Sequence, residues 1–159
     1  MSDKITTCLW FDTEGEAAAE FYCSVIPDSK VTDVSRYGES FPERAGTAMT
    51  VSFELDGRPY VALNGGPEHK FNESVSFQVA CEDQAEVDHY WEALTADGGE
   101  ESMCGWLKDK FGLSWQIVPT ALPQLISDPD PDRAHRAMKA MLSMRKIDIG
   151  AIREAADAG

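Results

Sequence analysis

Two stretches of the chain share the same order of hydrophobic and polar positions. Residues 5–12 alternate as a β-strand does, and residues 14–26 place apolar side chains at helical spacing. Residues 74–81 and 83–96 repeat this order, with a strand-like run before a helical one. The pattern therefore predicts two helices, each following a strand whose apolar face it can cover.

A predicted hairpin follows in each half of the chain. Residues 48–63 alternate on both sides of Asp56-Gly57, a dipeptide typical of tight hairpin turns. Residues 105–118 form a shorter alternating run that turns near Gly112. Each half then has the order strand–helix–strand–strand–strand.

The two halves can be aligned with each other. Alignment on the helices places Thr7 on Ser76, and alignment on the hairpins places Val61 on Gln116. Chance repetition of so simple a pattern is the alternative. A true repeat predicts an α+β fold, in which paired βαβββ modules form a curved mixed sheet around a cavity, with further helices at the C-terminus.

The boundaries of these parts follow from the pattern. We expect a first module at residues 1–70, a second at 71–119 and a C-terminal helical extension at 120–159, all within one structural domain. In the extension, Asp130 is expected to cap a helix whose first residue is Pro131.

The extension also carries a stripe of large apolar residues. Met138, Met141 and Leu142 fall on one face of the first expected helix, and a second helix is expected from Asp148 to about Ala156. Methionine-rich stripes are more often core or subunit interface than ligand site. Together with the difficulty of covering both sheet halves with two helices, the stripe predicts a homodimer.

Composition and charge narrow the partners. The 159 residues include 28 Asp and Glu against 14 Lys and Arg, a net charge of −14 that disfavours nucleic acid and anionic membranes. No apolar run approaches the ~20 residues of a membrane-spanning helix. The N-terminus has no signal-peptide pattern, so we expect a cytoplasmic protein. Isolated cysteines without a CxxC pair are expected to be reduced: Cys8, Cys23, Cys81 and Cys104.

Strand alternation also predicts a polar face. Ser74, Ser76 and Gln78 share one side of their strand, and Ser114 and Gln116 share one side of theirs. Uncharged hydrogen-bonding groups on a concave sheet are typical of a hydrated pocket. The solvent-facing side of an antiparallel sheet would show the same alternation, so both interpretations stay open.

Apolar and aromatic residues are expected to form the walls of this pocket. Leu9 and Phe11 share a strand face with Thr7, and Trp106 and Lys108 lie on the strand that leads towards the polar face. Lys108 could meet an anionic ligand, although a solvated hairpin lysine is the simpler interpretation. The other tryptophans are expected in the core beneath the helices: Trp10, Trp91 and Trp115.

Several long motifs resemble one known family. The chain contains ITTCLWFD (5–12), RYGE (36–39), ALNGGPEHKFNESVSFQV (62–79) and CGWLKDKFGLSWQIVP (104–119). These resemble the PhnB-like proteins, a branch of the glyoxalase/bleomycin-resistance/dioxygenase group, also called the vicinal oxygen chelate superfamily. The branch often carries the label 3-demethylubiquinone-9 3-methyltransferase. The resemblance covers nearly the whole chain and implies paired βαβββ modules and a homodimer.

The resemblance also implies where a metal would bind. Enzymes of the superfamily hold a divalent ion with four His or Glu ligands, and the matching positions here are Thr7, approximately Val61, Ser76 and Gln116. Valine cannot bind a metal, and uncharged oxygens bind one weakly without carboxylate or imidazole partners. We therefore expect no metal and no other cofactor. Of the histidines, only His69, in a loop near the expected cavity rim, is a candidate for ligand contact or proton transfer.

Two classes of function are the main candidates, and a purely structural dimer partner stays open as a further alternative. The first is a metal-free protein that binds a small organic ligand in a dimeric cavity, with Thr7, Val61, Ser76, Gln78 and Gln116 among the expected contacts. The second is an enzyme of the superfamily that uses unconventional metal ligands or acid–base residues; no catalytic residue can be assigned. A methyltransferase would need a glycine-rich turn after its first strand, and Asp12-Thr13-Glu14-Gly15 does not provide one.

Overall fold

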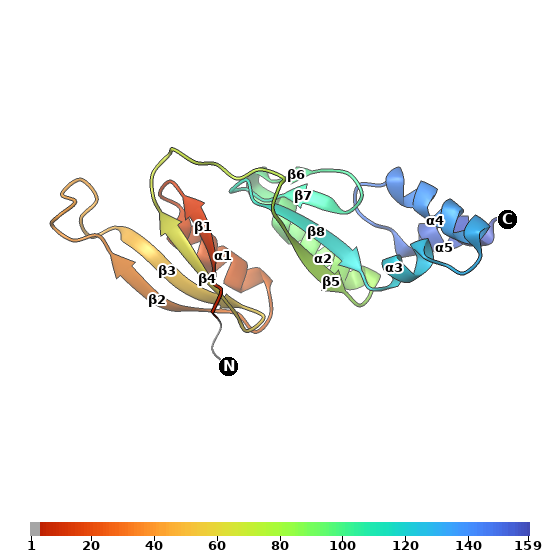
Figure 1. Ribbon diagram of the computed structural model, residues 1–159, viewed down its shortest axis with the longest axis horizontal. Coiled ribbons are helices and arrows are strands. Elements are labelled where there is room, and N and C mark those ends of the chain that lie inside the picture. Colours follow the sequence, from red (N-terminus) through yellow and green to blue (C-terminus); the bar gives the residue numbers. More distant parts are fainter. Residues whose placement is uncertain (1–3) are drawn as a thin grey trace. The chain divides into compact units, whose positions relative to one another are not determined.

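The computed structural model describes residues 4–159, which form two compact units (Figure 1). The first unit ends at Phe71 and the second begins at Asn72 and runs to Gly159. Each unit contains an open, four-stranded mixed sheet, so the α+β fold of paired βαβββ modules is confirmed.

The first unit has one helix and four strands. In chain order these are β1 (Thr7–Phe11), α1 (Gly15–Val25), β2 (Lys30–Arg36), β3 (Ala48–Leu55) and β4 (Arg58–Asn64). The order across the sheet is β1-β4-β3-β2, with β1 parallel to β4 and the other neighbours antiparallel. The predicted turn at Asp56-Gly57 joins β3 to β4, and both residues take positive φ, as such turns require.

Helix α1 covers one face of this sheet. The ring of Tyr22 lies against Phe53, and on the same face Val51, Ala62 and Leu9 follow one another across three paired strands. Val51 and Ala62 are fully buried. This face is therefore the hydrophobic core of the first unit.

The expected wall residues of β1 belong to that core. Leu9 and Phe11 are each 4% exposed, and the strand period of two places Thr7 on the same helix-covered face. The prediction that Leu9 and Phe11 line an open cavity is thus wrong in its choice of face. Trp10 was expected beneath the helix and instead points to the opposite face.

The second unit begins with the same arrangement. It contains β5 (Ser76–Cys81), α2 (Gln84–Thr95), a short 3₁₀ turn (Ala96–Gly98), β6 (Glu100–Glu101), β7 (Trp106–Lys108) and β8 (Ser114–Pro119). The order across the sheet is β5-β8-β7-β6, with β5 parallel to β8. Trp91 of α2 and Trp115 of β8 are buried, which confirms their predicted place in the core.

The two sheets differ in register by one residue. Cys8, not Thr7, pairs with Val61 in the first sheet, whereas Gln78 pairs with Gln116 in the second. Alignment on the helices had placed Thr7 on Ser76. Because side chains alternate between faces, an offset of one residue moves every side chain of the strand to the opposite side.

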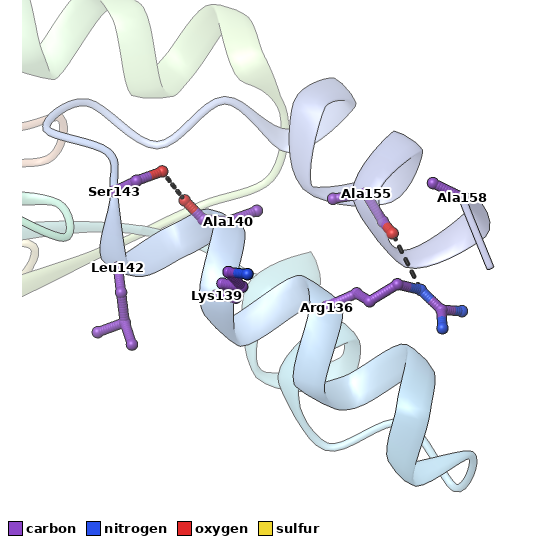
Figure 2. Close-up of a pocket in the computed structure, with 7 residues that line it drawn as sticks. All are labelled: Arg136, Lys139, Ala140, Leu142, Ser143, Ala155 and Ala158. Carbon is purple, nitrogen blue, oxygen red and sulfur yellow. Dashed lines mark hydrogen bonds between the residues drawn. The ribbon is translucent and has the colours of Figure 1, made fainter.

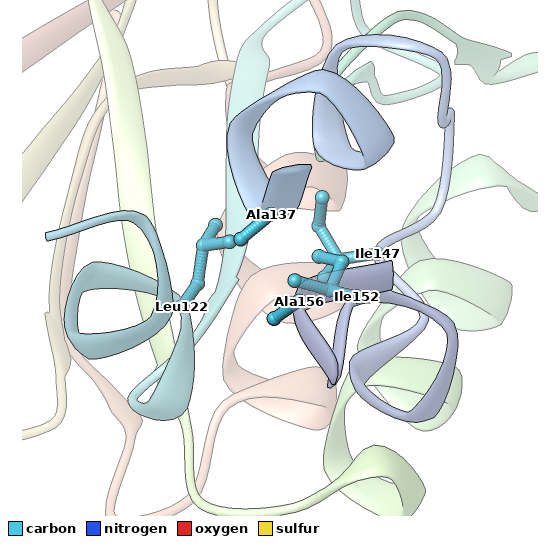
Figure 3. Close-up of a cluster of buried hydrophobic side chains, with 5 residues drawn as sticks. All are labelled: Leu122, Ala137, Ile147, Ile152 and Ala156. Atoms are coloured by element: carbon cyan, nitrogen blue, oxygen red, sulfur yellow. The ribbon is translucent and has the colours of Figure 1, made fainter. Parts of the chain in front are cut away.

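The C-terminal extension forms three helices, α3 (Ala121–Ile126), α4 (Pro131–Leu142) and α5 (Ile149–Asp157). They bury a cluster of their own, shown in Figure 3, which consists of Leu122, Ala137, Ile147, Ile152 and Ala156. The predicted cap is confirmed: Asp130 accepts a hydrogen bond from the amide of Asp132. The second expected helix begins at Ile149, and Asp148 caps it by accepting from the amide of Ala151. The short helix α3 was not predicted.

The segment between α4 and α5 attaches the extension to the second sheet. The amide of Cys104 donates to the carbonyl of Met144 at 2.8 Å, and that of Gly105 donates to Arg145 at 2.8 Å. The Gln84 side chain donates to the carbonyl of Ile147 and accepts from the amide of Ile149. The extension is thus packed on the second module as part of one compact unit.

Candidate functional site

Three polar side chains form a hydrogen-bonded row on the second sheet. Gln78 Nε2 donates to Gln116 Oε1 at 3.2 Å, and Gln116 Nε2 donates to Ser76 Oγ at 2.8 Å. Gln78 is exposed, whereas Ser76 and Gln116 are half-buried. We call Ser76, Gln78 and Gln116 the polar row. The structure therefore brings together three of the residues that the sequence places at a ligand site.

The strand register extends this face across three strands. Lys108 and Ser76 both pair with Ser114, and Trp106 and Gln78 both pair with Gln116. Paired residues point to the same side of a sheet, so Trp106 and Lys108 share the face of the polar row. The opposite face carries the buried Trp115 and packs beneath α2.

Ser114 is the unexpected member of this face. The sequence placed it on the polar side without assigning it a role. Its side chain is 1% exposed, and its hydroxyl has no hydrogen-bond partner among residues 4–159. Buried hydroxyls are nearly always hydrogen-bonded, so the Ser114 hydroxyl needs a partner that residues 4–159 do not supply, such as a water molecule or a ligand.

Lys108 is not free on this face. Its ammonium forms a direct ion pair with Glu73, a residue of the loop that precedes β5. The hydrogen bond from Lys108 lowers the pKa of Glu73, and the same contact raises the pKa of Lys108. The side chain of Glu73 is 61% exposed and that of Lys108 is 36% exposed, so solvent screens the pair and it contributes little to stability.

The corresponding face of the first sheet is different. Cys8 and Val61 lie side by side in register, next to Ser52 of β3. Thr7 is exposed, and by strand period it faces away from Val61. The structure therefore does not bring Thr7, Leu9 or Phe11 together with Val61.

His69 lies in the loop after β4. It is exposed, and its ring meets that of Trp10 edge-on, with centroids 4.8 Å apart. The Trp10 indole also donates to the carbonyl of Gly66 at 2.8 Å, so the loop folds over this ring. A Cβ on Gly65 would clash with the indole, which explains a glycine at that position. These contacts give His69 a role in fixing the loop.

Comparison with known proteins now identifies the family. Residues 3–118 match the family described as 3-demethylubiquinone-9 3-methyltransferase. The chain belongs to this PhnB-like family. A PhnB protein from Bacillus cereus is 32% identical over 74% of this chain and 100% of its own, with a TM-score of 0.68. No curated protein matches the chain.

More distant solved structures agree in fold. A protein from Pseudomonas aeruginosa is 20% identical, covers 74% of this chain and 98% of its own, and has a TM-score of 0.60. The fosfomycin resistance protein FosX from Listeria monocytogenes is 17% identical, covers 78% and 96%, and has a TM-score of 0.52. This PhnB-like chain therefore has the fold of the vicinal oxygen chelate superfamily. Its C-terminal extension, residues 120–159, lies beyond the matched family region.

The metal that the superfamily implies does not fit the residues present. The positions in register across the two modules are Cys8, Val61, Gln78 and Gln116. They supply one thiol, one apolar side chain and two uncharged amides, and one thiol with two amides is too weak a set of ligands to hold a divalent ion. Across residues 4–159, no group of three His, Cys, Asp or Glu side chains is placed to hold a metal.

None of the residues of the polar row lines either of two further cavities. One, of about 590 Å³, is a groove between α4 and α5, shown in Figure 2. Arg136 reaches across it and donates to the carbonyls of Ala155 and Ala156. Leu142, also in its lining, is 56% exposed. Of the predicted apolar stripe, Met141 packs against the buried cluster while Leu142 does not.

The second cavity, of about 480 Å³, lies in the first unit. Here the motifs RYGE and ALNGG meet: the Tyr37 hydroxyl donates to the carbonyl of Asn64, and Asn64 Oδ1 accepts from the amide of Gly15 at 2.7 Å. Arg36 forms an ion pair with Glu16 on its rim. Sequence reasoning missed this convergence, since nothing in either motif indicates its partner.

Within the described chain, no helix is long and apolar enough to cross a membrane.

Proposed function

We propose that this protein binds a small organic ligand on the polar row of its second sheet, without a metal, in a cavity completed by a homodimer. The observation that supports this most directly is the row itself, in which Gln116 is hydrogen-bonded to both Ser76 and Gln78. The row fixes the side-chain amides in one orientation, and preorganised polar groups lower the cost of binding.

The row retains hydrogen-bonding capacity for a ligand. The Ser76 oxygen accepts from Gln116, so its own proton can serve another acceptor. Gln78 keeps its carbonyl oxygen and one amide proton, and Gln116 keeps one amide proton. Trp106, next to Gln116, supplies an aromatic wall. A few fixed polar groups beside an aromatic surface are typical of small-molecule sites.

We do not extend methyl transfer, the activity in the family description, to this chain. The connection from β1 to α1 is Asp12-Thr13-Glu14, which lacks the glycines that let a cofactor approach the start of a helix closely. The polar row contains no histidine or carboxylate that could act as a general base. The polar row can therefore bind a ligand with the side chains it has, whereas catalysis would need a general base from elsewhere.

The homodimer is proposed from exposed apolar surface on the extension. Leu142 is exposed beside the groove between α4 and α5, where Arg136 and Lys139 supply the polar rim. Light scattering at micromolar concentration should give twice the chain mass of 17.5 kDa. Leu142→Lys should shift the mass towards the monomer, and a wild-type mass of one chain would reject the dimer.

The binding site is tested by Gln116→Leu. A thermal-shift screen first identifies a ligand. Gln116→Leu should then weaken its binding by about 1–3 kcal/mol, because the ligand group that Gln116 binds would be left buried without a hydrogen bond. Gln124→Leu, on the exposed surface of α3, is the matched control and should have no effect. Unchanged affinity in Gln116→Leu would reject the site, and one equivalent of bound metal in protein purified without chelator would reject the metal-free mechanism.

A further inference from the structure

The unpaired hydroxyl of Ser114 lies at the centre of a small polar cluster. It pairs in register with Ser76 on one side and with Lys108 on the other. Ser76 uses its oxygen as an acceptor, so two hydroxyl protons lie on this face beside one ammonium group. Such a set of donors matches the oxygens of an anion.

A carboxylate from the chain itself already occupies part of this cluster. Glu73 lies in the loop before β5, and its carboxylate forms an ion pair with Lys108. It satisfies Lys108 alone and leaves the Ser114 hydroxyl unpaired. The side chain of Glu73 is 61% exposed, so it can move aside without disturbing packed structure.

We propose that Glu73 stands in for the carboxylate of the ligand, and that a carboxylate-bearing molecule displaces it to bind Lys108, Ser76 and Ser114. This inference rests on the proposed function and specifies the ligand as a small organic anion. The incoming carboxylate would accept from both hydroxyls as well as from the ammonium. It therefore gains hydrogen bonds that the Glu73 carboxylate does not make.

Other charges on this face set the strength of the effect. Glu100 of β6 pairs in register with Lys108 and stays close to it when Glu73 leaves. Its negative charge weakens the site for any anion, and the net charge of −14 acts in the same direction at low salt. At about 0.15 M salt, charges beyond about 8 Å are largely screened, so the neighbours of Lys108 decide the outcome.

The test uses benzoate as the probe and benzamide as its uncharged counterpart of nearly the same shape. Each is titrated into ¹⁵N-labelled protein at 0.15 M salt, and the side-chain amides of Gln78 and Gln116 and the indole of Trp106 are followed. We expect benzoate to bind more tightly than benzamide and to move these resonances. The aromatic ring of both probes suits the wall formed by Trp106.

Variants then separate the contributions. Glu73→Gln should tighten benzoate about two- to fivefold, the range that the loss of a competing exposed ion pair allows, and leave benzamide unchanged. Lys108→Gln should abolish the preference for benzoate. Lys30→Gln, which breaks the similarly exposed pair with Glu54 in the first sheet, is the matched control and should change neither probe.

Ser114→Ala gives an independent readout. Removing an unpaired buried hydroxyl should raise the melting temperature of the free protein, while weakening benzoate about two- to tenfold. A lower melting temperature would show that the hydroxyl already has a partner, such as a buried water, and would overturn its part in the site.

The outcomes distinguish this inference from the proposed function. If benzamide and benzoate bind equally and both depend on Gln116, the row binds ligand but the carboxylate assignment is overturned. If neither probe moves these resonances, in wild type and Glu73→Gln alike, the assignment is overturned as well. If benzoate binds elsewhere and Gln116→Leu changes nothing, the proposed site itself is rejected.

Discussion

The two modules have the same topology but differ by one residue in the connection between the first strand and the helix. Both sheets place the first strand parallel to the last, and in both the helix covers one side. Three residues connect β1 to α1, whereas two connect β5 to α2. Counted back from the first residue of the helix, that single extra residue changes which positions of the strand point to the open face. The order and direction of the strands are therefore the same in both modules, although the connection between strand and helix differs in length by one residue.

The open faces show the result. In the second sheet the uncharged polar row lies on the open side, beside Trp106. In the first sheet the matching positions are Cys8 and Val61, which offer no comparable hydrogen-bonding row. Within residues 4–159, only the second sheet therefore carries such a row, and the proposed binding site rests on it.

The largest expected effect tests the register of β1. Leu9→Ala should destabilise the protein by about 2–4 kcal/mol, because Leu9 is buried beneath α1 among fully buried neighbours. Cys8→Ala, one residue away on the open face, should cost less than about 1 kcal/mol. Urea unfolding followed by circular dichroism measures both. A larger loss of stability in Cys8→Ala than in Leu9→Ala would show that Cys8, and not Leu9, faces α1.

A smaller effect separates the ways in which the two helices begin. Helix α1 has no side-chain cap of its own; instead Asn64, at the end of β4, accepts from Gly15 and donates to the carbonyl of Ala48. Helix α2 is capped locally by Asp83, which accepts from Glu86. Asn64→Ala leaves two buried backbone groups unpaired and should cost about 1–3 kcal/mol.

The local cap should matter less. Asp83→Ala removes a single, exposed hydrogen bond and should cost about 1 kcal/mol. Asn72→Ala, in an exposed turn, serves as the control for removing an asparagine side chain. Equal losses in Asn64→Ala and Asp83→Ala, measured by urea unfolding, would contradict the distinction between a buried and a local cap.

The sequence predicts most of the fold because its signals are local. Period-two alternation, the Asp56-Gly57 turn, the cap at Asp130 and the helix that starts near Asp148 each depend on a few neighbouring residues, and the structure contains all of them. The polar row followed from the same alternation. Helix α3 was missed because its six residues, with Pro123 among them, are too few to show a period.

The features that were missed depend on tertiary contacts. The face of β1 is set by how many residues separate it from α1, and hydrophobicity alone cannot supply that count, because Thr7 and Cys8 suit either side. Glu73 lies in a loop, and the hydrophobic pattern of a loop does not predict that its carboxylate will pair with Lys108. The partnerless hydroxyl of Ser114 likewise becomes visible only when every neighbour is in place.

The smallest expected effect concerns the extension, which only the second module carries. Asp88 of α2 accepts hydrogen bonds from Lys146 at 2.8 Å and from Gln84 at 3.1 Å, and these contacts lower the pKa of its carboxyl group. A carboxyl whose pKa is lower in the folded state stabilises the fold above its unfolded value of about 3.9. That contribution is lost as the pH falls through the folded pKa. Lys146→Ala should therefore cost up to about 1 kcal/mol at neutral pH, a limit set by the exposure of the pair, and nearly nothing at about pH 2.5.

Urea unfolding at the two pH values measures this dependence, with Lys30→Ala in the first module as the matched change. The Lys30–Glu54 pair is 3.9 Å apart, so its removal should alter stability little at either pH. Gln84→Ala removes an uncharged side chain that holds the same extension through two hydrogen bonds, to the carbonyl of Ile147 and to the amide of Ile149. It should therefore also lower the stability of the protein. If the loss in Lys146→Ala is as large at low pH as at neutral pH, the aliphatic part of Lys146, and not its ion pair with Asp88, attaches the extension to the second module.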